Sequence, residues 1–227
     1  MSADAPLPPP VAREVFADDA WPLAEAYARM LAGPAVVRGL LGPREVDRLW
    51  DRHLLNCAVV AEAIPRDVHV VDIGSGAGLP GVVLAIVRPD ISVTLLEPLL
   101  RRVVFLEECV AELKLGNIEV LRARAEELAG ERSFEVAVAR AVAPLERLLT
   151  WSMPLLHQGG ELLAMKGERA AAELAEAESQ LRACGAERAE LVAVGHGKVE
   201  PPATLVRVVA GRPPGRGRRD PRRRRKR

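Results

Sequence analysis

The segment Val70-Val71-Asp72-Ile73-Gly74-Ser75-Gly76-Ala77-Gly78-Leu79-Pro80-Gly81 decides the fold of this chain. It begins as a short apolar run and passes into three glycines at alternate positions. Glycine has no Cβ, so the backbone there can turn sharply and approach a ligand closely. A glycine-rich turn that follows a buried strand and opens a helix is the context in which such a turn binds a nucleotide-like cofactor.

The glycine spacing and Asp72 distinguish two classes of cofactor. A dinucleotide site reads G-x-G-x-x-G and presents a helix amino terminus to pyrophosphate, whereas this turn reads G-x-G-x-G and is preceded by Asp72. A carboxylate repels pyrophosphate but suits the ammonium end of S-adenosylmethionine, directly or through water. Glu97 follows the next apolar run, where an acidic residue can bind ribose hydroxyls. We therefore favour the methyl donor over a nicotinamide dinucleotide, with a turn that binds no ligand as the remaining alternative.

Short apolar runs alternate with helical segments after residue 68, which is typical of βαβ units and a parallel sheet. Strands are predicted at 68–73, 92–96, 118–121, 134–139, 161–166, 189–194 and 204–209. Only nine residues separate the last two, too few for a crossover helix, so they should form an antiparallel hairpin. The expected fold is α/β and Rossmann-like, with a seven-stranded, mostly parallel sheet and helices on both faces.

Helical periodicity and breaker residues predict the remaining elements. Helices are expected at 11–31, closed by Gly33-Pro34; after Gly42-Pro43; near Leu79; at 99–115, closed by Gly116-Asn117; at 145–156; and at 169–183. The first two would form an amino-terminal helical appendage, residues 11–66, before a methyltransferase domain at 67–211. Residues 1–10 are rich in proline and residues 212–227 in arginine, so both ends are expected to be disordered.

The composition of the chain argues against a secreted, membrane-spanning or zinc-binding protein. The start of the chain lacks the features of a secretory signal, and no apolar run is long enough to cross a membrane, so we expect a soluble, cytoplasmic protein. The three cysteines, Cys57, Cys109 and Cys184, have neither zinc-site nor disulfide spacing, so we expect reduced thiols and no metal. Residues 212–227 hold nine arginines, one lysine and one aspartate, a charge of +9, so residues 1–211 carry −8 of the total +1.

Five motifs resemble the bacterial RsmG (GidB) methyltransferases over roughly residues 20 to 210. They are Asp72-Ile-Gly-Ser-Gly-Ala-Gly-Leu-Pro-Gly81, Trp50-Asp-Arg-His-Leu-Leu-Asn56, Arg124-Ala-Glu126, Ala139-Arg-Ala141 and Lys166-Gly167. The resemblance implies S-adenosylmethionine-dependent methylation of N7 of one guanine in the 530 loop of 16S ribosomal RNA, near the streptomycin-binding region. In the family, loss of the enzyme is linked to low-level streptomycin resistance.

The resemblance also implies roles for individual residues. Gly74 and Leu79 would contact the methyl donor, Ala125-Glu126 would lie along the adenine, and Arg140 would reach the cofactor from the fourth strand. Glu97-Pro98 stands where the family commonly has Asp-Ser, which preserves an acidic group for the ribose. The predicted cofactor-binding set is Asp72, Gly74, Ser75, Gly76, Gly78, Leu79, Glu97, Pro98, Ala125, Glu126 and Arg140.

Methylation of guanine N7 requires little chemical assistance from protein side chains. N7 carries a lone pair and no proton, so methyl transfer needs no general base, and orientation of the reactants becomes the main requirement. Arg140 and Lys166 lie at the carboxyl ends of the fourth and fifth strands, where α/β sheets bind ligands, and are the catalytic candidates. We assign them phosphate, O6 or cofactor contacts, because a guanidinium on both O6 and N7 would cover the methylated atom. The alternative is a solvated or carboxylate-paired charge; for His53 we expect a core or capping role.

Basic residues supply the expected contacts with a polyanion, since lysine and arginine neutralise phosphates. The predicted RNA-binding residues are Arg52, Arg101, Arg102, Lys166, Arg212, Arg222, Arg223, Arg224 and Arg225. The expected partner is 16S ribosomal RNA or the small ribosomal subunit, bound by a monomer. Three alternatives stay open: a methyltransferase acting on a small molecule, one acting on another RNA, and a non-catalytic regulator that binds S-adenosylmethionine.

Overall fold

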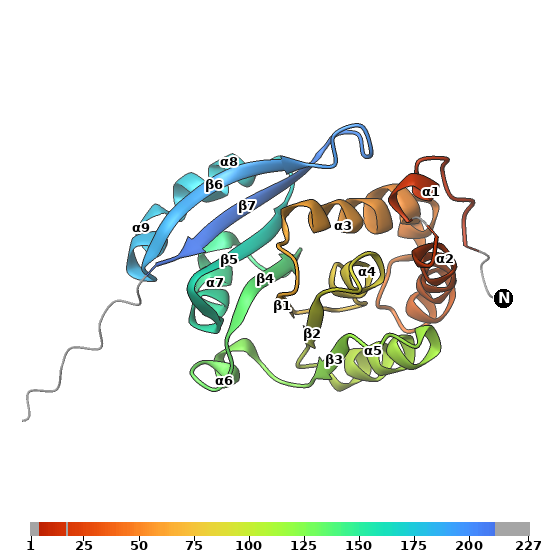
Figure 1. The fold of residues 1–227 in the computed structure, drawn as a ribbon, viewed down its shortest axis with the longest axis horizontal. Coiled ribbons are helices and arrows are strands. Elements are labelled where there is room, and N and C mark those ends of the chain that lie inside the picture. Colours follow the sequence, from red (N-terminus) through yellow and green to blue (C-terminus); the bar gives the residue numbers. More distant parts are fainter. Residues whose placement is uncertain (1–4, 17, 212–227) are drawn as a thin grey trace, which may run out of the picture.

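A computed structural model of the chain describes residues 5–16 and 18–211. Its centre is a seven-stranded sheet with the strand order β3-β2-β1-β4-β5-β7-β6 (Figure 1). The strands are β1 (His69–Ile73), β2 (Ser92–Leu96), β3 (Ile118–Leu121), β4 (Phe134–Arg140), β5 (Leu156–Lys166), β6 (Ala186–Val194) and β7 (Ala203–Ala210). Strands β1 to β5 pair in parallel, whereas β7 is antiparallel to both β5 and β6. The predicted fold class and the antiparallel carboxyl-terminal hairpin are confirmed.

Helices cover both faces of the sheet. Alternate residues of a strand point to opposite faces, and Val70 of β1 accordingly packs in one core cluster while Val71 packs in the other. The first face carries α4 (Gly81–Val87) and α5 (Leu100–Leu113), and the second carries α6 (Ala125–Leu128), α7 (Leu145–Ser152), α8 (Ala170–Glu176) and α9 (Glu178–Ala183). Figure 1 shows α4 and α6 on opposite sides of the sheet. Because helices cover both faces, the central strands are mostly apolar.

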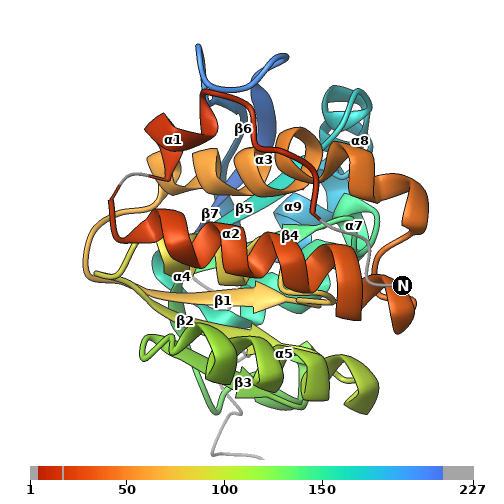
Figure 2. The same cartoon turned by 90° about the vertical axis from the view of Figure 1, so that its right-hand side faces the viewer.

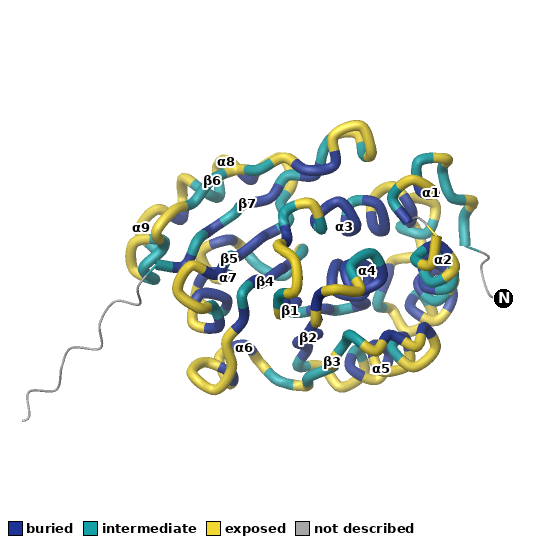
Figure 3. Tube along the Cα trace, in the orientation of Figure 1, coloured by how far each residue is buried: buried dark blue, intermediate teal, exposed yellow. Residues whose placement is uncertain are grey.

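The amino-terminal helices form an outer layer over the first face. They are α1 (Ala12–Val15), α2 (Ala20–Met30), the π-helix η1 (Leu31–Ala35), the 3₁₀ helix η2 (Pro43–Arg48), the π-helix η3 (Leu49–Leu55), α3 (Asn56–Ala58) and the 3₁₀ helix η4 (Val59–Ala63). Figure 2 shows α2 in front of α4, and the core on this face includes residues of both helices. A helix that is apolar on every side must be buried, and α4 is coloured as buried in Figure 3.

The amino-terminal region differs from the predicted pair of helices. The expected helix at 11–31 is two helices, with Asp18 at a φ of 45° shortly before α2 begins. Gly33-Pro34 does not close α2, because the π-helix η1 continues the helical path through Pro34. The helical segment ends at Val37, shortly before Gly39 with its φ of 66°. Residues 5–10, where we expect disorder, are among the described residues. The Pro6 carbonyl accepts a hydrogen bond of 2.9 Å from Trp50 Nε1. Residues 1–4 and the tail 212–227 lie outside the described residues.

Several other boundaries differ from the prediction, and β5 begins at Leu156 rather than at 161 and β6 at Ala186 rather than at 189. Helix α4 begins at Gly81 rather than near Leu79. Helix α5 ends in left-handed Lys114, at a φ of 52°, instead of at Gly116-Asn117. Helix α7 ends at Ser152, and Leu156 already belongs to β5, where it pairs with Phe134 of β4. The predicted helix at 169–183 is divided at Ala177 into α8 and α9, while the short helix α6 was not predicted.

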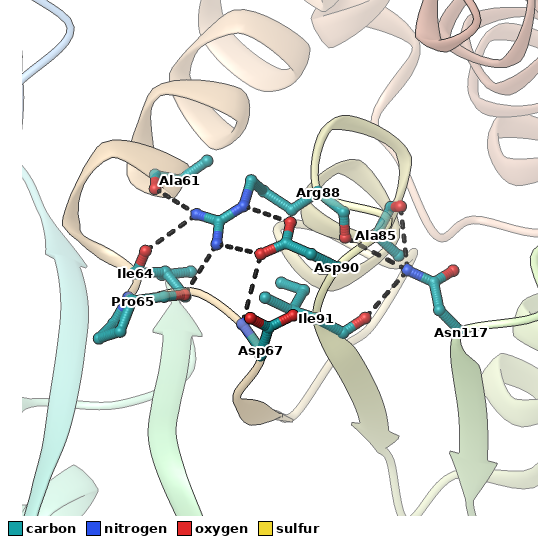
Figure 4. Close-up of polar contacts among 9 residues, drawn as sticks. All are labelled: Ala61, Ile64, Pro65, Asp67, Ala85, Arg88, Asp90, Ile91 and Asn117. Carbon is teal, nitrogen blue, oxygen red and sulfur yellow. Dashed lines mark hydrogen bonds and ion pairs between the residues drawn. The ribbon is translucent and has the colours of Figure 1, made fainter.

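A polar network fastens the outer layer at the amino-terminal edge of the parallel strands (Figure 4). The Arg88 guanidinium donates to the carbonyls of Ala61, Ile64 and Pro65 and forms an ion pair with Asp90 at 2.6 Å. The side-chain amide of Asn117 lies 3.1 Å from the carbonyls of both Ala85 and Ile91. These contacts satisfy backbone groups at the ends of η4 and α4, which would otherwise be left without partners. In the described part of the chain, no helix is both long and apolar enough to cross a membrane.

Candidate active site

A cavity of about 560 Å³ opens beside the glycine-rich turn. The carboxyl ends of β1, β2 and β4 all contribute to its wall, through residues such as Ile73, Leu96 and Arg140. Parallel α/β sheets bind ligands at this edge, and the volume is in the range of small-molecule and cofactor sites. The residues of the predicted cofactor set that line it are Gly74, Ser75, Gly76, Leu79, Glu97, Pro98, Ala125, Glu126 and Arg140.

The turn between β1 and α4 is held in one conformation by contacts from the outer layer. The Tyr27 hydroxyl of α2 donates a hydrogen bond of 2.6 Å to the Ala77 carbonyl. Gly78 has a φ of 94°, and a Cβ on it would lie 2.6 Å from both the Tyr27 hydroxyl and Val82 Cγ2. A Cβ on Gly76 would meet only the Gly74 carbonyl, at 3.8 Å, so this part of the turn leaves space for a ligand. Gly78 itself does not line the cavity.

Asp72 lies behind the turn and does not line the cavity. The residue is 1% exposed, and its Oδ2 accepts a hydrogen bond of 3.0 Å from the Gly81 amide at the start of α4. Oδ1 has no hydrogen-bond partner among the described residues. Burial raises the pKa of Asp72 to about 7. In this structure the carboxylate joins β1 to α4, and its expected contact with an ammonium group stays a prediction.

Glu97 lies in the cavity wall directly after β2. Its side chain is 1% exposed, and Oε2 accepts a hydrogen bond of 3.0 Å from the Gly76 amide. The Leu99 amide donates to Oε1 at 3.0 Å, and Arg102 Nη1 lies 3.3 Å from Oε2. Glu97 therefore connects the glycine-rich turn to the start of α5. Its carboxylate is fixed at the position where the sequence predicts ribose recognition.

The opposite part of the wall comes from the start of α6 and from α7. Ala125 and Glu126 form the first turn of α6, which is fixed by a capping box in which the Glu127 side chain accepts from the Arg124 amide at 3.0 Å. Trp151 of α7 also lines the cavity. Ala125 and Trp151 add apolar surface to the cavity wall. Such a wall suits the planar base of a nucleoside.

Arg140 ends β4 and is held by the amino-terminal layer. Its Nη2 atom lies 2.6 Å from His53 Nδ1 and 3.1 Å from the Arg52 carbonyl, and Nη1 lies 3.1 Å from Cys57 Sγ. The other ring nitrogen of His53, Nε2, lies 2.9 Å from Glu45 Oε2. Burial, followed by the charge of Arg140, lowers the pKa of His53 to about 4. His53 is buried, as expected, but it also lines the cavity with Arg140.

A second, larger hollow of about 1490 Å³ adjoins the cavity. The two share Arg140, Ala141 and Val142 in their walls. Ala141 has a φ of 54°, a left-handed conformation that costs a residue with a Cβ about 1–3 kcal/mol. Backbone strain of this kind concentrates at functional sites, and here it lies between the two hollows.

The other basic residues predicted to act in catalysis or RNA binding are distributed around these hollows. Lys166 and Arg52 line the second hollow. The Lys166 ammonium donates to the Ala143 carbonyl at 2.9 Å and to Glu173 at 2.7 Å. Arg102 lines the first cavity, whereas exposed Arg101 lines neither. Arg212 and Arg222 to Arg225 lie outside the described residues.

Sequence reasoning missed four residues that shape the site: Tyr27, Cys57, Ala141 and Trp151. For Tyr27 and Cys57 the relevant partner is far away in the chain, at Ala77 and Arg140, so no local pattern points to the contact. The left-handed conformation of Ala141 has no signal in the residue type, because alanine rarely adopts it. Trp151 lies on a helix whose apolar face predicts burial but does not indicate a cavity.

Comparisons with known proteins agree with this geometry. The sequence model of the family described as "GidB: rRNA small subunit methyltransferase G" matches residues 21–200. A relative from Thermobifida fusca, named ribosomal RNA small subunit methyltransferase G, is 58% identical over 89% of this chain and 85% of its own length. A relative of the same name from Nocardioides is 57% identical over 92% of this chain and 84% of its own. A solved structure, a SAM-dependent O-methyltransferase from Thermotoga maritima, has a TM-score of 0.54 at 14% identity, over 69% of this chain and 65% of that one, and shows the fold.

Proposed function

Because this chain belongs to the rRNA small subunit methyltransferase G (GidB) family of S-adenosylmethionine-dependent methyltransferases, we propose that it methylates N7 of a guanine in the 530 loop of 16S ribosomal RNA. The observation that carries this proposal is the pair of adjoining hollows. A cavity of cofactor size beside the glycine-rich turn shares one wall, Arg140 to Val142, with a larger and more polar hollow. Two reactants bound in these hollows would meet at that wall.

The residues of the first cavity fit S-adenosylmethionine. The glycine-rich turn leaves space at Gly76, and the Glu97 carboxylate is fixed at the end of β2, where ribose hydroxyls are bound in related α/β sites. Ala125 and Glu126 would lie along the adenine, with Trp151 completing the apolar wall. Arg140 would contact the cofactor or the RNA from the end of β4. The proposed cofactor-binding residues are those of the predicted set that line the cavity.

The chain's own residues bind and orient the reactants rather than transfer protons. When bound, S-adenosylmethionine supplies a methyl group on a sulfonium, which leaves with the C–S bond electrons staying on sulfur as the N7 lone pair forms the new bond. N7 has no proton to remove, so the side chains around Arg140 need only hold the base against the cavity and exclude water. Correct orientation of two reactants can contribute about 7–11 kcal/mol to the reduction of the barrier.

The second hollow is the proposed site of the target nucleotide and its flanking phosphates. Arg48, Arg52 and Lys166 lie in its wall, and the Lys166 ammonium donates to the Ala143 carbonyl in the β4–α7 connection. A base in a folded RNA loop can be turned outward into a protein pocket, at a cost of a few kcal/mol of stacking. We further propose that the protein acts in the cytoplasm as a monomer on the small ribosomal subunit, with the arginines beyond residue 211 adding phosphate affinity.

The test is methyl transfer with labelled S-adenosylmethionine. Small ribosomal subunits from cells that lack this protein, the corresponding deproteinised 16S RNA and a metabolite extract are each incubated with the purified chain. The proposal predicts label in 16S RNA, released as N7-methylguanine from the 530 loop. Label in a metabolite would instead indicate a small-molecule methyltransferase, label in another RNA would change the substrate, and binding of the cofactor without transfer would indicate a regulator.

A further inference from the structure

The contacts of Arg140 determine which ring nitrogen of His53 carries the proton. A guanidinium has only donors, so the 2.6 Å contact between Arg140 Nη2 and His53 Nδ1 requires a lone pair on Nδ1. The proton must then lie on Nε2, which donates to Glu45 Oε2 at 2.9 Å. Arg140, His53 and Glu45 thus form one directed chain of hydrogen bonds. Because its Nδ1 lone pair is engaged by Arg140, His53 is not a free general base in this structure.

The direct hydrogen-bond partners of Arg140 in the described part of the chain are groups other than carboxylates. Within residues 5–16 and 18–211, Arg140 forms no ion pair with a carboxylate. Its three partners are the ring of His53, the Arg52 carbonyl and the Cys57 sulfur. Burial raises the pKa of the Cys57 thiol and lowers that of His53, so both groups are neutral near pH 7.

Neighbouring basic residues are paired differently. Lys166 lies 2.7 Å from Glu173, Arg102 lies 3.3 Å from Glu97, and Arg52 lies 3.4 Å from Glu45. A carboxylate partner would compete with an incoming anion, whereas neutral acceptors hold a guanidinium without neutralising it. Arg140 lines both hollows, so its charge is available where the two reactants would meet.

We propose that His53 is a positioning residue for Arg140. Its Nδ1 holds the guanidinium at the wall shared by the two hollows, where the charge binds an anionic oxygen group. Glu45 supports this arrangement by fixing the tautomer of His53. The anionic group is either the carboxylate of S-adenosylmethionine or a phosphate of the RNA substrate. This inference rests on the proposed function. It adds a role for the amino-terminal helices, which supply both His53 and Glu45 and so position Arg140.

A pair of substitutions separates the two ring nitrogens. In His53→Asn the amide oxygen can occupy the position of Nδ1 and still accept from Arg140. In His53→Gln the amide lies near the position of Nε2, so the contact with Glu45 can persist but the acceptor for Arg140 is lost. His157 on β5, which lies 3.5 Å from Glu135 and lines neither hollow, gives the matched controls His157→Asn and His157→Gln. Thermal unfolding of each variant establishes that it is folded.

The expected result is a loss of about tenfold or more in kcat/KM for His53→Gln, since a small displacement of a positioning group can cost up to about a hundredfold. His53→Asn should recover most of that loss. In an Arg140→Lys background, His53→Gln should cause little further loss, because the group it positions is already changed. Equal losses in the two His53 variants, or a full additional loss in the Arg140→Lys background, would overturn the proposal.

Calorimetric Kd values for S-adenosylmethionine identify the anion. A raised Kd in His53→Gln and in Arg140→Lys assigns the contact to the cofactor carboxylate, whereas an unchanged Kd with a raised KM for RNA assigns it to a phosphate. If neither constant changes, Arg140 binds no anion and the inference fails. The His157 variants should leave both constants at their original values.

Nitrogen NMR tests the inference without RNA or catalysis. Long-range proton–nitrogen spectra of the folded protein at pH 7 should show the His53 proton on Nε2 and an unprotonated, hydrogen-bonded Nδ1. The signals that disappear in His53→Gln identify His53 among the four histidines. A proton on Nδ1 would contradict the positioning role even if the protein methylates ribosomal RNA, whereas the expected tautomer in a protein that does not methylate RNA would contradict the proposed function alone.

Discussion

Asp72 is buried, accepts a hydrogen bond from the Gly81 amide and has one oxygen without a partner among residues 5–16 and 18–211, so it should make stability depend on pH. Its pKa is about 7 in the folded protein, against an ordinary value of 3.8. Between these values the folded state keeps a proton that the unfolded state releases, so this residue's contribution to stability falls as the pH rises toward 7. Asp72→Asn removes this titration and keeps an oxygen for the Gly81 amide.

The expected result is that Asp72→Asn gains stability relative to the original protein as the pH rises from about 5 to 8, measured as the difference between their unfolding temperatures. His53, whose pKa is lowered to about 4, titrates with the opposite sign in part of this range, but both proteins share it. The difference between them therefore isolates Asp72. A difference that stays constant across the range would show that Asp72 is charged at every pH tested.

Tyr27 links α2 to the glycine-rich turn, and its hydroxyl should matter for cofactor affinity as well as stability. Tyr27→Phe leaves the buried Ala77 carbonyl without its donor, at a cost of about 1–3 kcal/mol. The loosened turn should raise the Kd for S-adenosylmethionine about fivefold, which corresponds to about 1 kcal/mol. Calorimetry gives the Kd, and chemical denaturation gives the stability.

Ser152→Ala is the control for Tyr27→Phe. The Ser152 hydroxyl is also buried and donates to a carbonyl, that of Leu148, at 2.9 Å. It lies on α7 and outside the cavity wall. We expect Ser152→Ala to leave the cofactor Kd unchanged. Equal Kd values for the two variants would mean that α2 supports the fold but does not shape the turn.

The strands could be predicted from the sequence, whereas several helix ends could not. Central parallel strands are buried on both faces, so β1, β2 and β4 consist mostly of apolar residues and stand out from their surroundings. Helix ends depend on single residues and on packing: Lys114 adopts a left-handed conformation, and the chain continues through Pro34 in a π-helix. Neither conformation can be predicted reliably from the type of residue at that position.

The candidate site could be predicted only where its residues belong to one continuous segment of the sequence. The glycine-rich turn and Glu97 belong to a local pattern, so the cavity wall they form could be expected from the chain. Contacts between distant segments could not, because nothing in the sequence pairs Arg140 with His53 or Tyr27 with Ala77. The position of Asp72 behind the turn is also a tertiary feature, set by its hydrogen bond to the Gly81 amide.

The Arg88 network lies at the edge of the sheet away from the cavity, so it should affect stability without affecting the site. Arg88→Met removes the donor shared by three backbone carbonyls, and we expect a loss of about 2 kcal/mol in the free energy of unfolding. The control is Arg132→Met, which removes the exposed pair with Glu119 and should cost no more than about 1 kcal/mol. A changed cofactor Kd in Arg88→Met would show that the two edges are coupled.

The molecule divides its charge between an acidic body and a basic tail, and this division predicts how RNA affinity depends on salt. Residues 212–227 carry +9, and the rest of the chain carries −8. A variant that ends at Gly211 should lose affinity for ribosomal RNA and show a weaker dependence of binding on salt, because fewer phosphates are neutralised. Its Kd for S-adenosylmethionine should not change. An unchanged methylation rate and salt dependence would remove the tail from substrate binding.

The central claim, that two adjoining hollows bring a methyl donor to guanine N7, is tested most directly by mapping modified bases in 16S ribosomal RNA. The RNA is isolated from cells with the protein, without it, and with the protein restored, and the 530 loop is analysed by mass spectrometry. We predict that one guanine carries an N7 methyl group with the protein, loses it without, and regains it on restoration. An N7 methyl group that persists in cells without the protein would contradict this account.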